Sequence, residues 1–176
     1  MSTESLAALL KVVPWIGVAG MILAVITYFN IKRHPEGSEL MKKISDKIHH
    51  GAFVFLKTEY SIISIFIVVV FIVLTMALSL NTAIAFLAGA VCSMGAGLLG
   101  MEAATRSSAR ACQGAKDGGI GKALMIAFSG GSVMGISVAA LGVVGLGLYF
   151  LFTNDPKIIN GFAMGASSIA LFARVG

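Results

Sequence analysis

The stretch that decides the fold is AIAFLAGAVCSMGAGLLGM (residues 83–101), followed by a basic connection and by ALMIAFSGGSVMGISVAALGVVGLGLYFLF (residues 123–152). Neither apolar segment contains a charged residue, and each has the length of about 20 residues that a helix needs to cross a bilayer. Small residues recur at every fourth position, at Ala85, Gly89, Ser93 and Gly97 in the first segment and at Ala127, Gly131, Gly135 and Ala139 in the second. Because lipid supplies no hydrophobic force between helices, such residues allow close backbone packing instead. We therefore expect both helices to be buried among other helices.

The connection between the two segments is MEAATRSSARACQGAKDGGIGKA (residues 101–123). Its first part contains no strong helix breaker, so the first helix is predicted to continue into the cytosol as far as about residue 116. The sequence Asp117-Gly118-Gly119 then predicts a break before the second span.

The composition is that of an integral membrane protein. Hydrophobic residues make up 57% of the chain and charged residues 12%, whereas an ordinary soluble domain has about 25% charged residues. The net charge of +5 lies in short loops between spans, where it orients the protein in the membrane, so we expect no nucleic-acid partner. Cys92 lies in a span and Cys112 in the basic connection, so the two are not expected to meet, and both are expected to be reduced.

The chain reads as an all-α membrane protein with about five transmembrane helices in a single region, residues 1–176. The expected spans are residues 12–31, 61–80, 83–101, 123–152 and an incomplete fifth span at 158–176. Before the second span, Leu40, Ile44 and Ile48 repeat every four residues opposite basic residues, which predicts an amphipathic helix with a possible bend at Gly51. The second span is rich in bulky side chains, which is typical of a helix that faces lipid.

The distribution of Lys and Arg predicts the topology. Basic residues are concentrated in segments 32–60 and 102–122, so both are expected to be cytoplasmic, with the N-terminus outside, in a multi-pass protein of the cell membrane. The fifth segment would then enter from outside, and it is slightly too short to span before the sequence stops. We therefore expect the chain to be the N-terminal fragment of a larger protein.

Two sequence features that suggest a ligand site fail on inspection. GAKDGGIGKA (residues 114–123) has Lys116 where a Walker-type phosphate loop needs Gly, and Ala123 where it needs Ser or Thr. His34, His49 and His50 lack acidic or cysteine residues at a recognisable ligand spacing, so we expect solvated or interfacial histidines rather than a metal site.

Acidic residues are missing from the apolar stretches. Glu59 and Glu102 flank spans, and we expect them to pair with nearby Lys or Arg at the membrane edge. A proton carrier usually has an acid inside the membrane, so the chain alone is not expected to translocate protons.

Arg174 is the one ionisable residue with an unusual position. It follows sixteen uncharged residues, which places it about 24 Å into the membrane if the segment enters from outside. A cation at that depth suggests a functional site. The alternative is that Arg174 marks the cytoplasmic edge of a short helix.

Four stretches together resemble the N-terminal part of the ion-translocating membrane pyrophosphatases. They are IHHGAFVFLKTEY (48–60), AFLAGAVCSMGAGLLGMEAATRSSARA (85–111), GKALMIAFSGGSVMGISVAALGVVGLGL (121–148) and GFAMGASSIALFARVG (161–176). The resemblance covers essentially the whole chain in the same order and spacing.

The resemblance implies a homodimer of sixteen-helix subunits that hydrolyses pyrophosphate with Mg²⁺ and pumps H⁺ or Na⁺ out of the cytoplasm. It leaves open which ion is pumped and whether K⁺ is required. The family's metal- and pyrophosphate-binding residues, in a run of the type DxxxDxxxK, follow the position of Gly176, so none is expected within this chain. One functional residue carries over: Arg174, in LFARVG, matches an arginine of the ion gate. The other helices would be peripheral.

Two other classes of function remain open. The chain could be a self-contained structural or assembly subunit that uses its glycine-rich helix faces to bind other membrane helices. It could instead be a rotor-type or channel-like subunit, although the missing intramembrane carboxylate counts against that class.

Overall fold

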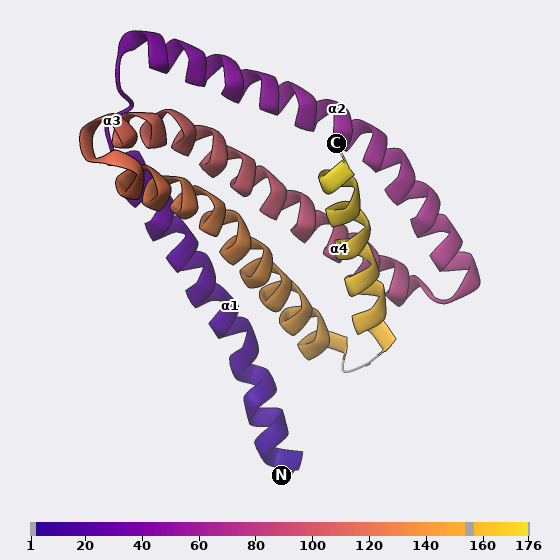
Figure 1. The fold of residues 1–176 in the computed structure, drawn as a ribbon. Helices are drawn as coiled ribbons and strands as arrows, with labels where there is room; N and C mark the ends of the chain where they lie inside the picture. Colours follow the sequence, from indigo (N-terminus) through magenta and orange to yellow (C-terminus); the bar gives the residue numbers. More distant parts are fainter. Residues whose placement is uncertain (1–2, 154–156, 176) are drawn as a thin grey trace.

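The computed structural model describes residues 3–153 and 157–175, and these residues form four helices without a strand (Figure 1). The helices are α1 (Thr3–Lys32), α2 (Glu39–Ala77), α3 (Leu80–Thr153) and α4 (Lys157–Val175). The α1–α2 connection and a sharp bend inside α3 lie at one end of the bundle, and the α2–α3 turn lies at the other. The prediction of an all-α protein is confirmed.

The bend divides α3 into a first arm, residues 80–117, and a second arm, residues 120–153, that runs back beside it (Figure 1). Gly118 and Gly119 have non-helical backbone angles, and Gly119 has a φ of 71°, a value that favours glycine. The bend therefore lies at the predicted Asp117-Gly118-Gly119 break.

Helices of membrane-spanning length and composition are present in three places: Val12–Lys32, Glu39–Ala77 and Leu80–Thr153. The third includes both arms of α3, each of which holds one of the predicted spans. A shorter apolar helix follows at Ile159–Phe172. These helices are those of a multi-pass membrane protein, and the count of five spans stays a prediction.

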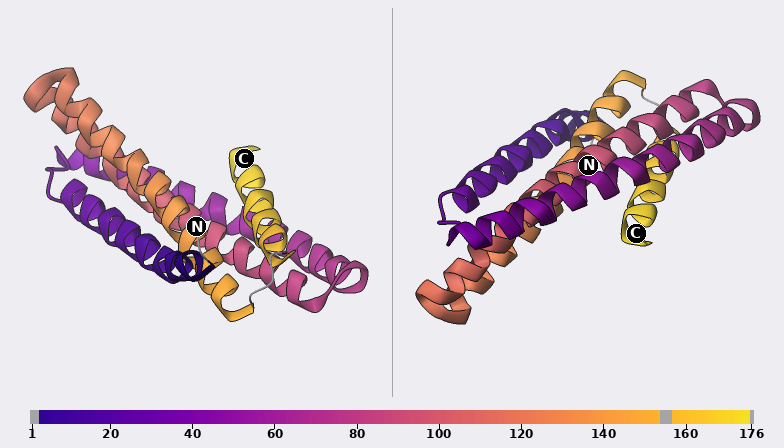
Figure 2. Two further views of the ribbon diagram at one scale, coloured as in Figure 1. Left: turned by 90° about the horizontal axis from the view of Figure 1, so that it is seen from below. Right: turned by 90° about the horizontal axis from the view of Figure 1, so that it is seen from above.

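The first arm of α3 is the centre of the bundle, with α1 and α4 on opposite sides of α3 (Figure 2). Phe86 on this arm is fully buried, together with Ile63 of α2 and Ile169 of α4. The predicted small-residue face is packed here: a Cβ atom at Gly89 would overlap the carbonyl oxygen of Phe162, and one at Gly165 would overlap that of Phe86. The crossing of α3 and α4 is thus a direct contact between backbones.

The predicted small-residue face of the second arm is not packed within the described part of the chain. Gly131 and Gly135 have no atom within 4 Å of the position of a Cβ. The packed face carries Ile126, Val133 and Ala140 instead, which are at most 4% exposed. The rotation of this arm about its axis is determined by its contacts with the first arm and α1, which the repeat of small residues does not encode.

The start of α2 is helical, as the four-residue repeat predicts, but the possible bend at Gly51 is absent. α2 is a single helix that passes through Gly51 without interruption. Leu40, Ile44 and Ile48 are 68%, 50% and 50% exposed, whereas the packed residues of α2 include Ser45 and, further along, Leu56 and Ile63. Because the helix is continuous, the face that packs in the apolar half also determines which face of the polar half meets α3.

Candidate functional site

The ionisable side chains of three helices meet around Glu102 on the first arm of α3. The hydroxyl of Tyr28 on α1 donates to Glu102 Oε1 at 2.9 Å. On the other oxygen, Oε2, Nε2 of His49 from α2 lies at 3.4 Å. Arg106 Nε lies 3.4 Å from Oε1, one turn along α3. We call Tyr28, His49, Glu102, Thr105 and Arg106 the Glu102 cluster.

His49 has acceptors at both ring nitrogens. Its Nδ1 lies 2.8 Å from the Thr105 hydroxyl oxygen, and that hydroxyl donates its proton to the carbonyl of Met101 at 2.8 Å. With the hydroxyl proton used, Thr105 accepts from Nδ1–H, while Nε2 faces the carboxylate of Glu102. The side chain of His49 is only 19% exposed, so both ring contacts are made within the packed interface of α2 and α3.

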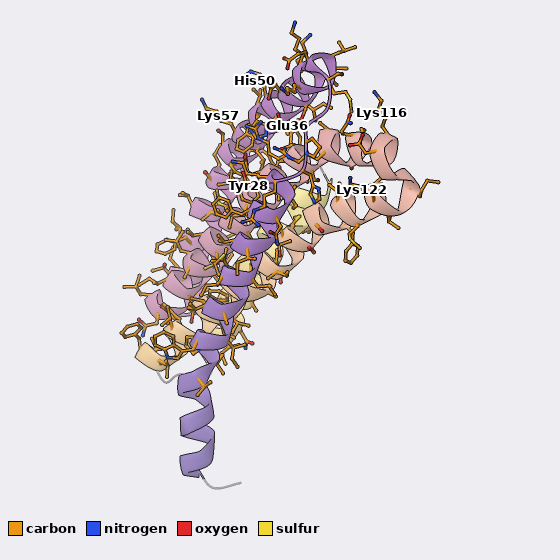
Figure 3. All side chains as sticks on the ribbon, turned by 90° about the vertical axis from the view of Figure 1, so that its left-hand side faces the viewer. Tyr28, Glu36, His50, Lys57, Lys116 and Lys122 are labelled. Atoms are coloured by element: carbon orange, nitrogen blue, oxygen red, sulfur yellow. The ribbon has the colours of Figure 1, made fainter. Side chains whose placement is uncertain are left out.

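Arg110 fastens the α1–α2 connection to the same arm of α3. Its side chain is 5% exposed, donates from Nε to the carbonyl of His34 at 3.2 Å, and pairs with Glu36. Arg106 extends the polar contacts further, with its NH1 3.3 Å from Asp46 Oδ1 of α2. In Figure 3 the labelled Glu36, His50, Lys116 and Lys122 all lie toward this end of the bundle.

The two acids expected to pair with basic residues behave differently. Glu102 pairs with Arg106, as predicted. Glu59 does not: its Oε1 is buried and has no hydrogen-bond partner in the described part of the chain. Glu59 follows the packed Leu56 and precedes the packed Ile63 on α2, so the helix directs it toward apolar neighbours instead of a loop.

The histidines also divide. His50 is exposed, as expected of a solvated residue, whereas His49 belongs to the Glu102 cluster, which the sequence interpretation missed. A usable signal was present, since Ser45, His49 and Leu56 share one helical face of α2. Cys92 and Cys112 are both free thiols, as predicted.

Arg174 lies in the last turn of α4, and its side chain lies outside the described residues. The prediction that it serves an ion gate therefore stays a prediction. Among the residues that the structure describes, no three His, Cys, Asp or Glu side chains are arranged to hold a metal ion. The Glu102 cluster can join helices through charged hydrogen bonds, but its carboxylate is already occupied by Arg106 and His49.

The family model and the known proteins that match this chain point to the same family. The family model described as "Inorganic H+ pyrophosphatase" matches residues 18–176. A protein of Clostridium tetani, named as a candidate K⁺-stimulated pyrophosphate-energized sodium pump, is 47% identical over 161 residues, which cover 91% of this chain and 24% of that protein. A K⁺-insensitive pyrophosphate-energized proton pump of Methanosarcina mazei is 35% identical over 165 residues, 93% of this chain and 24% of the pump.

A third relative, a K⁺-stimulated pyrophosphate-energized sodium pump of Thermotoga maritima, is 37% identical over 193 residues, 97% of this chain and 26% of the pump. The chain thus spans about a quarter of the length of the curated relatives it matches. These matches favour the resemblance over the structural-subunit and rotor alternatives. Because the family model covers most of its length, the chain belongs to the family of inorganic H⁺ pyrophosphatases.

Proposed function

We propose that the protein containing this chain hydrolyses pyrophosphate and uses the released free energy to move H⁺ or Na⁺ across the membrane, out of the cytoplasm. The observation that carries the proposal is the match of residues 18–176 to the pyrophosphatase family, with relatives that are named as pyrophosphate-energized pumps. In this proposal α1, α2 and α3 are peripheral helices, and α4 begins the helix that bears the gate residue Arg174.

The packing of α4 supports this division of roles. The helix is held against the first arm of α3 by the backbone contacts at Gly89 and Gly165, which leave no room for side-chain adjustment. Two turns further along the same face, Phe172 meets Phe66 of α2, with the ring centroids 5.2 Å apart. The middle of α4 is therefore fixed on α3 and its end contacts α2, so a gate residue in the last turn would have a defined position.

Mg²⁺ is the cofactor that this function requires, and the described residues do not fit it. No group of acids is available to bind it, since Glu102 is engaged by Arg106 and His49. We assign Mg²⁺ and pyrophosphate to carboxylates beyond residue 176, as the family resemblance implies. We further propose that the whole protein is a homodimer. This chain would contribute five spans, with the N-terminus outside and segments 32–60 and 102–122 in the cytoplasm.

Inverted membrane vesicles containing the expressed protein test the function. Addition of Mg²⁺ and pyrophosphate should release phosphate and either acidify the vesicle interior or drive Na⁺ uptake. Repeating the assay with and without K⁺ determines the K⁺ dependence, because relatives of both kinds match the chain. The absence of pyrophosphate hydrolysis would contradict the proposal.

Arg174→Ala tests the assigned gate in the same vesicles, with Lys116→Ala at an exposed position near the α3 bend as the matched loss of a positive charge. We expect Arg174→Ala to lower ion transport more strongly than hydrolysis, and Lys116→Ala to leave both near the wild-type level. Equal transport by the two variants would remove Arg174 from the gate and leave the pump assignment intact.

A further inference from the structure

A crevice of about 120 Å³ lies between α1 and the two arms of α3. Its floor is buried, with Ala24 of α1 and Val133 of the second arm 2% and 3% exposed. Its rim is open, with Val25 and Leu99 45% and 43% exposed. The crevice is therefore a recess in the outer surface of the bundle.

The recess opens where the chain is apolar. Val25 lies within the apolar segment of α1, and Leu99 lies within residues 83–101, so the opening lies at the depth of the hydrocarbon part of the bilayer. An empty apolar recess there loses the packing contacts that close-packed neighbours provide. Helices that pack together keep their axes about 8–10 Å apart, so a recess of this volume is too small for another helix and suits a flexible alkyl chain.

One end of the recess is marked by cations. Tyr28 lines it, and the ammonium group of Lys32 lies 5.4 Å from the centroid of the Tyr28 ring. Lys32 is four residues after Tyr28, about 6 Å further along the helix axis, and Arg33 follows it. Both basic residues are exposed at the point where α1 ends.

The acid at this end does not cancel that charge. Glu102 also lines the recess, but Arg106 and His49 contact its two carboxylate oxygens. Lys32 therefore stands at this end of the apolar recess through its contact with Tyr28, and Arg33 follows it in the chain. Within the described part of the chain, neither basic side chain has an acidic partner. An anionic phospholipid has the matching order of groups, a phosphate at the membrane surface and an acyl chain directly beneath it.

We propose that this recess is a specific binding site for an anionic phospholipid of the cytoplasmic leaflet. One acyl chain lies over Ala24 between Val25 and Leu99, and the phosphate is bound by Lys32 and Arg33. The site joins α1 to both arms of α3 through the lipid, and it is independent of the pump activity proposed above.

Photolabelling of the purified full-length protein tests the site. The protein is placed in vesicles of equal parts phosphatidylcholine and phosphatidylglycerol, with a trace of either lipid carrying a diazirine in its acyl chain. After irradiation, labelled residues are mapped by mass spectrometry. We expect phosphatidylglycerol to label the peptides around Val25 and Leu99 several-fold more than phosphatidylcholine does.

Two sets of variants separate the recess from the charges. Ala24→Phe fills the floor and should abolish labelling by both lipids, whereas Ile26→Phe, at an exposed position on the opposite side of α1, should not. Lys32→Gln with Arg33→Gln should reduce phosphatidylglycerol labelling to the phosphatidylcholine level. Lys43→Gln with Lys47→Gln, exposed on α2, is the matched loss of two charges.

Three results would overturn the proposal. Equal labelling by the two lipids would show ordinary annular lipid, and labelling unaffected by Ala24→Phe would place the lipid elsewhere. Absence of labelling around Val25 and Leu99 by either lipid would show that a side chain of another helix fills the recess. If Ala24→Phe does not fold, the charge variants, which lie on the exposed end of α1, still decide between specific and annular lipid.

Discussion

The imidazole of His49 lies 3.4 Å from the carboxylate of Glu102, so an acid–imidazole contact joins α2 to the first arm of α3. The two residues are far apart in the sequence, and among the described residues neither has another long-range ionic partner. The phenol of Tyr28 contacts the same carboxylate, so one acid connects the three long helices.

Glu102→Gln should therefore weaken the association of three helices at once. The amide keeps the shape of the side chain but loses the charge that Arg106 and His49 face, and we expect a loss of about 1–2 kcal/mol in unfolding free energy, reduced from the buried value because Glu102 is 29% exposed. Thermal unfolding of the purified protein in detergent measures the change.

Glu39→Gln is the control for the loss of one negative charge. The hydrogen bond from Lys42 to Glu39 raises the pKa of Lys42, but the pair is exposed, and exposed pairs contribute little to stability. An unfolding temperature that falls equally in both variants would show that the Glu102 cluster does not join the helices.

Gly89→Ala should disrupt the crossing of α3 and α4. The new methyl group would overlap the carbonyl oxygen of Phe162, which is backbone and cannot rotate away, so the helices must separate. We expect a loss of about 1–3 kcal/mol, the usual range for overpacking. Chemical unfolding in detergent is the measurement.

Gly51→Ala provides the matched substitution at an open helical position, since nothing lies within 4 Å of its Cβ. Alanine in a helix interior is favoured over glycine by about 0.5–1 kcal/mol, so this variant should be unchanged or slightly stabilised. A stable Gly89→Ala protein would mean that α4 does not cross α3 through its backbone.

Arg110→Ala should release the α1–α2 connection. The 5% exposed guanidinium holds Glu36 and the carbonyl of His34, and its removal leaves both without that donor. We expect faster cleavage within residues 33–38 in limited proteolysis. The cleavage rate of Arg110→Lys should lie between those of the wild type and Arg110→Ala, because an ammonium group keeps the charge but cannot reproduce the planar set of donors.

Lys116→Ala, at an exposed position on the same arm of α3, is the control and should leave the cleavage rate of the connection unchanged. Protection of the connection in Arg110→Ala would show that other contacts hold it in place.

The two native thiols report the proposed topology without added cysteines. Cys112 is exposed on segment 102–122, and Cys92 is half-buried in an apolar segment. A membrane-impermeant maleimide should modify Cys112 in inverted vesicles and fail to do so in intact cells, with Cys112→Ser as the control for background labelling. Modification of Cys112 from outside the cell would reverse the proposed orientation.

Local sequence determined the class of the protein and the limits of several of its elements. Apolar length predicted membrane-spanning helices, because a helix must satisfy its own backbone in lipid whatever surrounds it. The Gly118-Gly119 pair predicted the bend in α3, because glycine by itself adopts a positive φ such as that of Gly119 without a steric cost. Motifs distributed over the chain indicated the pyrophosphatase family before any contact was known.

Tertiary structure alone decided how each helix is rotated about its axis. The same spacing of small residues is packed at Gly89 and open at Gly131. On α2, Leu40 is exposed to solvent or lipid, whereas His49 contacts Glu102 of α3. For the same reason, Glu59 has a buried Oε1 without a partner in the described part of the chain, whereas Glu102 is paired. A helical repeat states which residues share a face, but contacts with distant segments determine what that face meets.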